Sequence, residues 1–131
     1  MIGRFLLASI TVFVLWSGAD YLFHGVILAD AYRDTAQLWR PAGEAMLGLH
    51  TVVVLCSAVL FCAIYSLLVV PRSVRSAILY GALFGLAGGI SFGYGMYAFM
   101  PLPHDMAVTW LIASLVEGVL GGLALGYILG T

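Results

Sequence analysis

Four long runs of apolar residues divide the chain, and short polar segments separate them. The runs cover about residues 5–28, 45–70, 74–100 and 106–130. Each exceeds the ~20 residues that an α-helix needs to cross the ~30 Å hydrocarbon core of a membrane. No segment shows the apolar–polar alternation of a barrel strand. The pattern predicts an all-α bundle of four transmembrane helices, with residues 1–131 as a single transmembrane domain and residues 29–44 as the longest loop.

The composition agrees with a membrane protein. Of the 131 residues, 63% are hydrophobic and 8% are charged, and the mean hydropathy is +1.11. A soluble domain carries about a quarter charged residues. The net charge is −1 and lysine is absent, so nucleic acid is not an expected partner. The first apolar run resumes after Asp20 and continues to Leu28, which favours a transmembrane span over a cleaved signal peptide.

The distribution of arginines predicts the orientation. Arg4 precedes the first run, and Arg72 and Arg75 lie in the short turn between the second and third. The loop 29–44 also carries two arginines, but acidic residues accompany them. Cytoplasmic loops carry an excess of positive residues. Both termini and the arginine turn are therefore expected in the cytoplasm, with the loop 29–44 and the turn 101–105 on the outer side.

Small residues recur every fourth position in the last two runs. One series is Gly81, Gly85, Gly89 and Gly93, and the other is Ser114, Gly118, Gly122, Gly126 and Gly130. Such a series gives a helix a smooth face that another backbone can approach closely. We expect the third and fourth helices to pack together through these faces. The alternative is that one face mediates oligomerisation.

Ionisable residues lie inside three of the predicted spans. Asp20 and His24 are four residues apart and share one helix face with Trp16. His50 lies in the second run and Glu117 in the fourth. Such groups cost at least ~2.5–3.5 kcal/mol each at the membrane centre, so they require partners. At ~1.5 Å per residue they all fall in the outer half of the membrane, and we expect them to converge there.

Three uses of these residues remain open. Imidazole and carboxylate groups on neighbouring helices bind transition metals, so Cu, Zn or Fe is one candidate cofactor. The predicted ligands are Asp20, His24, His50 and Glu117, with Glu44 and His104 as outer contributors. A proton relay uses the same residues equally well. The third reading is a hydrogen-bonded network that only joins the helices. A haem on His24 and His50 is a weaker fourth option.

Other polar or sulfur-containing residues have simpler interpretations. Glu44 suits the N-terminal dipole of the second helix. Cys56 and Cys62 are six apart in one apolar run, which predicts core cysteines and no disulfide. Methionines near the outer ends of the helices are expected to pack, although thioethers together with histidines would favour Cu(I). They are Met46, Met96, Met100 and Met106.

No motif for catalysis is present. The serines lack a nucleophile elbow, and neither a phosphate loop nor a dinucleotide fingerprint occurs. The sequence therefore favours a protein that is not an enzyme and has no catalytic residues. Two alternatives to a metal or proton site follow from the small size and the glycine faces. One is an accessory subunit of a larger, redox-type membrane complex. The other is an oligomeric transporter or channel whose path Glu117 lines.

The first helix and first loop carry a recognisable pattern. It runs Trp16-x-x-x-Asp20-x-x-x-His24-Gly25, then Tyr32, Leu38-Trp39-Arg40-Pro41 and Glu44. In this pattern the chain resembles a group of small bacterial four-helix membrane proteins of uncharacterised function. The resemblance implies a protein of the bacterial inner membrane, and it implies no activity.

Overall fold

The computed structural model describes residues 1–130, and every regular element within them is a helix. Elements η1 and η4 are π-helical, whereas η2 and η3 are single 3-10 turns. In chain order the elements are α1 (Ile2–Asp20), η1 (Tyr21–Ile27), α2 (Ala29–Asp34), η2 (Ala36–Leu38), η3 (Ala42–Glu44), α3 (Leu47–Leu68), α4 (Val74–Gly89), η4 (Ile90–Tyr94), α5 (Gly95–Phe99) and α6 (His104–Leu129).

Four stretches of helix are long and apolar enough to cross a membrane. They are Ile2–Ile27, Leu47–Leu68, Val74–Phe99 and His104–Leu129. The first combines α1 with η1, and the third combines α4, η4 and α5. Many of their large apolar side chains are exposed, as a surface that faces lipid requires. The prediction of an all-α bundle with four long apolar helices is confirmed, and the chain is a small integral membrane protein.

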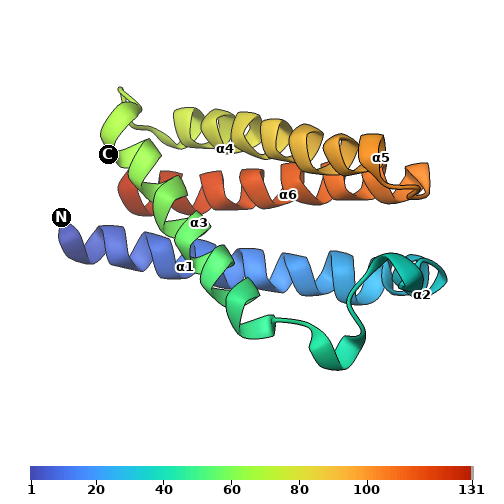
Figure 1. Cartoon of the computed structure of the whole chain (residues 1–131). Helices are drawn as coiled ribbons and strands as arrows, with labels where there is room; N and C mark the ends of the chain where they lie inside the picture. The colour runs from blue at the N-terminus through green and yellow to red at the C-terminus, as the bar shows by residue number, and fades with distance from the viewer. Residues whose placement is uncertain (131) are drawn as a thin grey trace.

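Three of the four rods lie side by side, and the fourth crosses them. Figure 1 shows α6 between α1 and the α4–α5 rod, with α3 running diagonally over the bundle. Both chain ends lie at the same end of the bundle as the turn between α3 and α4, which we call the terminal end. The opposite end, which we call the loop end, carries α2 and the turn between α5 and α6. The oblique course of α3 separates its first turns from α6.

Helices α4 and α6 are in backbone contact. A methyl group built on Gly81 would collide with the carbonyl oxygen of Gly118, and one on Gly85 would collide with that of Ser114. A methyl group on Gly89 would lie 2.9 Å from the Cα atom of Leu111. No side chain larger than hydrogen fits at these three α4 positions without a shift of one helix.

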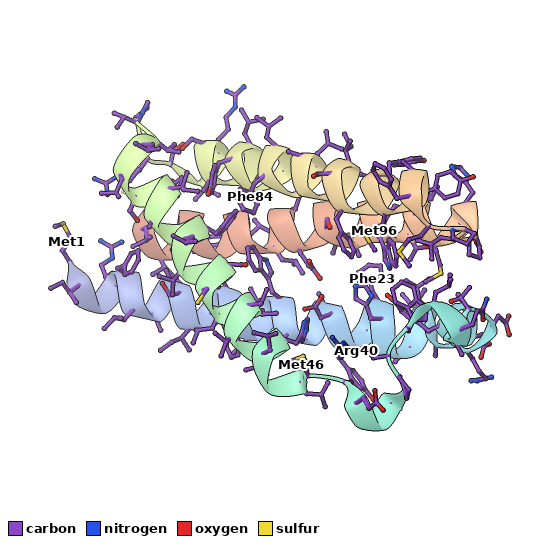
Figure 2. All side chains as sticks on the ribbon, viewed as in Figure 1. Met1, Phe23, Arg40, Met46, Phe84 and Met96 are labelled. Carbon is purple, nitrogen blue, oxygen red and sulfur yellow. The ribbon has the colours of Figure 1, made fainter. Side chains whose placement is uncertain are left out.

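Aromatic rings join the helices at the middle of the bundle. The indole Nε1 of Trp16 donates to the backbone oxygen of Glu117 at 2.7 Å, which links α1 to α6. The Trp16 ring packs on Phe61 of α3, with 5.0 Å between ring centroids. A methyl group on Gly121 would lie 2.9 Å from the Phe61 ring, so this glycine makes room for it. Phe84, labelled in Figure 2, brings α4 into the group by packing edge-on against Phe61.

Polar side chains close the terminal end. The guanidinium Nε of Arg4 donates to the backbone oxygen of Ile128 at 2.7 Å, in the last turn of α6. The last carbonyls of a helix lack intrahelical partners, and a cation complements their partial negative charge. The hydroxyl of Tyr65 likewise donates to the backbone oxygen of Ser73 at the start of α4. These bonds fix the ends of α1 and α3 to the helices beside them.

A second core lies at the loop end. Trp110, which is 2% exposed, packs there with Leu28, Leu102 and Met106. The rings of Tyr32 and Trp39 and the thioethers of Met96 and Met100 surround this core. Figure 2 labels Met96 on the side of the α4–α5 rod that faces α1. The interpretation of Met96, Met100 and Met106 as packing residues is confirmed, whereas Met46 is exposed.

The start of α3 differs from the prediction. The sequence places Glu44 at the first turn of this helix, but α3 begins at Leu47 and Glu44 belongs to the separate turn η3. The amide of Glu44 bonds the oxygen of Pro41 at 2.8 Å, and Ala45 then takes an extended conformation. The interpretation of Glu44 as the dipole partner of this helix is therefore wrong.

One of the two cysteines also departs from the prediction. Cys62 is buried in the core, but Cys56 is exposed on α3. Because α3 crosses the bundle obliquely, only the face that carries Val54, Ala58 and Phe61 meets the other helices. Cys56 does not lie on this face. Because α3 is apolar on all sides, its sequence does not show which side packs against the other helices.

Candidate functional site

The first candidate residues lie where α1 changes its winding. Asp20 is the last residue of α1, and His24 lies in the π-helical segment η1. The distance from His24 Nε2 to Asp20 Oδ1 is 3.8 Å. Single π-helical turns inside α-helices occur frequently at functional sites. The four-residue spacing predicts that these side chains share a face, and nothing in the sequence predicts the π-helical winding.

Asp20 is the centre of a group that draws on three rods. His50 of α3 places Nε2 at 3.4 Å from Asp20 Oδ2, while His24 approaches the other carboxylate oxygen. Glu117 of α6 lies near enough to Asp20 for the charges of the two carboxyls to interact, and both side chains line the same cavity. We call Asp20, His24, His50 and Glu117 the polar group. The side chains of Asp20, His24 and His50 are 22%, 35% and 60% exposed, and Glu117 is partly buried.

Tyr32 connects the polar group to the loop end. Its hydroxyl lies 2.6 Å from His24 Nδ1 and accepts a hydrogen bond from the indole of Trp110 at 3.0 Å. Because an indole only donates, the Tyr32 proton is free to point at His24. His24 Nδ1 then accepts, and the proton of neutral His24 lies on Nε2, which faces Asp20.

The surroundings of Tyr32 keep its phenol neutral. Burial raises the pKa of Tyr32 above its ordinary value of 10.0, and the charge of Asp20 raises it further, while the bond from Trp110 opposes them. A neutral phenol retains the proton that the bond to His24 requires. Tyr32 therefore remains a donor throughout the physiological range of pH.

Glu117 has an incomplete set of partners. Its Oε1 atom is buried and, within residues 1–130, makes no hydrogen bond. An unpaired polar atom costs about 1–3 kcal/mol when it is withdrawn from water. The backbone oxygen of the same residue accepts a hydrogen bond from the indole of Trp16 at 2.7 Å, which links this turn of α6 to α1. The carboxyl of Glu117 is thus positioned to bind a further group.

A cavity of about 760 Å³ lies against the polar group. All four members of the group line it, together with apolar and aromatic side chains of α1, α3, η4 and α6. Its lining residues come from α1, η1, α3, η4 and α6. A smaller cavity of about 110 Å³ lies among Trp16, Phe84 and the glycines of α4 and α6, and Glu117 and Ser114 line both.

The two outer candidates lie elsewhere. Glu44 is exposed in η3, and His104 is exposed at the start of α6, where its Nε2 atom lies 3.2 Å from the Tyr94 hydroxyl. Neither residue lines the large cavity. The structure therefore brings together four of the six residues predicted as metal ligands and leaves these two outside.

Metal ligation receives no support from this geometry. Among residues 1–130, no three His, Cys, Asp or Glu side chains form a group that could hold a metal ion. Both histidines direct Nε2 at Asp20, so neither presents that nitrogen to a haem iron. What the group offers chemically is two neighbouring carboxyls, two imidazoles beside Asp20 and space on one side.

Sequence reasoning missed the roles of Tyr32 and Trp110. Tyr32 enters the sequence argument only as part of the pattern in the first helix and loop, and Trp110 does not enter it. The available signal was the spacing of eight residues between His24 and Tyr32, about two helical turns. The bend of the chain between η1 and α2 at Leu28 then folds the second residue back toward the first.

Comparisons with protein-family models, with curated proteins and with solved structures find no match to this chain.

Proposed function

We propose that the polar group is a proton-carrying site inside the membrane, in which Asp20 and Glu117 hold a proton between them, His50 exchanges it and His24 helps to hold Asp20 in place. One observation carries this proposal: the side chain of Asp20 meets His24, His50 and Glu117 at the edge of a single cavity. The three partners come from η1, α3 and α6, so the contact needs the folded bundle.

The chemistry follows from the proximity of two carboxyls. Two like charges side by side in an apolar setting are unfavourable, and a pair of carboxyls avoids them by sharing one proton. The pair then titrates as a unit, as coupled acids do. An adjacent imidazole accepts and returns a proton near neutral pH. His50, the most accessible member, is the natural point of exchange with the outside.

A hydrogen-bonded side branch of the polar group leads toward the loop end. Tyr32, His24 and Asp20 form a chain of polar groups, with 2.6 Å between the phenol and the imidazole. The next step, 3.8 Å from His24 Nε2 to Asp20 Oδ1, is longer than a hydrogen bond. A bridging water or a small turn of the imidazole closes such a gap. The chain fixes the orientation of the His24 imidazole, and the position of His24 sets how closely its Nε2–H approaches Asp20.

Infrared spectroscopy in lipid tests the shared proton. The carbonyl stretch of a protonated carboxyl is separate from the bands of a carboxylate, and we expect wild-type protein to show one such signal at neutral pH. Glu117→Gln removes the shared proton and the signal, and Asp20→Asn shifts or removes it. Glu44→Gln is the matched control, because this glutamate is exposed outside the cavity. A signal unchanged in both cavity variants contradicts the proposal.

We further propose that the terminal end faces the cytoplasm of a bacterial inner membrane. Arg4, Arg72 and Arg75 support this orientation, because all three belong to the end where the termini meet. The assignment to a bacterial inner membrane rests on the resemblance that the first helix and first loop show to small bacterial four-helix membrane proteins. We expect alkaline phosphatase fused after the last residue to be inactive and a fluorescent protein at the same place to be bright. The reverse pair of results contradicts this orientation.

A further inference from the structure

The large cavity has the dimensions of a ligand site. Its volume of about 760 Å³ lies within the ~300–1,000 Å³ range of pockets that bind small molecules. Such pockets are mostly apolar, with a few polar groups that fix the orientation of the ligand. Here Leu47, Val53 and Val54 supply apolar wall on the α3 side. The polar group supplies the few polar atoms.

The charge of the lining favours a cation. Two carboxyls border the cavity, while none of the five arginines does, and the chain has no lysine. The only basic side chains present are the two histidines, and His24 accepts a hydrogen bond from Tyr32 in its neutral form. An anion would find no fixed positive charge there. A cation would find Asp20 and the unpartnered Oε1 atom of Glu117.

The shape of the lining favours an organic cation over a metal ion. Aromatic residues of α1, η1, η4 and α6 line the cavity, namely Phe13, Tyr21, Phe92 and Trp110. The face of such a ring attracts a cation within about 6 Å of its centre, and rings of this kind recognise quaternary ammonium groups. A metal ion would need a set of ligating side chains that residues 1–130 do not provide.

We infer that this cavity binds a monovalent lipophilic organic cation, held by the carboxyls of Asp20 and Glu117 against the aromatic walls. The inference rests on the proposed proton site, because the cation and the proton use the same pair of carboxyls. Binding of the cation to this pair displaces the shared proton into solution. Cation and proton therefore compete, and the cation binds more tightly as the pH rises.

Tetraphenylphosphonium is the probe for the test. Titration into detergent-solubilised protein, followed by calorimetry in two buffers of different ionisation enthalpy, gives both the affinity and the number of protons released. We expect saturable binding with release of about one proton, and at least a tenfold loss of affinity, about 1.4 kcal/mol, in Glu117→Gln and Asp20→Asn. Glu44→Gln, outside the cavity, leaves binding unchanged.

A variant that fills the cavity tests the site without removing a polar side chain on which the fold could depend. Val53 is half-exposed on α3 and lines the cavity, so Val53→Phe fills space without removing a buried contact, and we expect it to weaken binding also. Absence of saturable binding in wild-type protein, or equal binding in all variants, overturns the inference. Binding without proton release supports the cation site and contradicts the shared proton. An infrared signal without binding supports the shared proton and contradicts the cation site.

Discussion

Replacement of Gly85 by alanine is expected to destabilise the bundle severely, while the same change at Gly88, less than one turn further along α4, does not. A methyl group at Gly85 would collide with the carbonyl oxygen of Ser114 and lie 3.0 Å from the Cα of Leu115. A methyl group at Gly88 has no atom of another helix within 4 Å. Overpacking costs about 1–3 kcal/mol where side chains can yield, and more where the obstacle is backbone.

The sign of the two effects differs. We expect Gly85→Ala to lower the free energy of unfolding by about 3 kcal/mol or more, because α4 and α6 must separate to admit the methyl group. Gly88→Ala gains helix propensity, so its effect is neutral or stabilising by up to about 1 kcal/mol. Unfolding in mixed micelles, followed by circular dichroism, measures both. Similar losses in the two variants would contradict the proposal that the glycine faces hold the α4–α6 pair together.

Much of this architecture could be predicted from the sequence because lipid imposes simple rules. Four apolar runs of sufficient length leave only helices as an option, since backbone groups in hydrocarbon must bond within their own segment. The spacing of Asp20 and His24 likewise follows from helical geometry. The residue at which a helix begins could not be predicted in the same way, as Glu44 shows. A 3-10 turn and a helix N-terminus use the same residue types.

The composition of the site was harder to predict for a different reason. His50 and Glu117 lie on separate helices, and their meeting with Asp20 depends on the rotation and crossing of α3, which a uniformly apolar helix does not encode in its pattern. Glu44 and His104 were assigned to the site by depth alone, although depth does not determine which side of the bundle a residue occupies. Tyr32 reaches His24 only because the chain turns back after η1.

Trp110→Ala is expected to have the second large effect, by releasing the loop 29–44 from the bundle. The Trp110 ring is 2% exposed and packs against the rings of Tyr32, Trp39 and Phe92. Removal of a buried tryptophan side chain costs about 3–5 kcal/mol. Tyr32→Phe keeps the ring but leaves the buried indole N–H of Trp110 without its acceptor, so it should cost about 1–3 kcal/mol. The difference between the two variants separates ring packing from the hydrogen-bonded chain.

Limited proteolysis reports directly on the loop. Arg33 lies in the last turn of α2 and forms an ion pair with Asp30 at 3.0 Å, and trypsin cleaves after it only when α2 unwinds. Arg40 is followed by Pro41 and resists the enzyme. We expect rapid cleavage after Arg33 in Trp110→Ala and slow cleavage in wild type, Tyr32→Phe and the control Phe99→Ala, whose ring is 92% exposed. Since Tyr32 orients His24, a freed loop also breaks the Tyr32–His24 chain. Equal cleavage in Trp110→Ala and wild type would mean that the loop is held by contacts other than this ring.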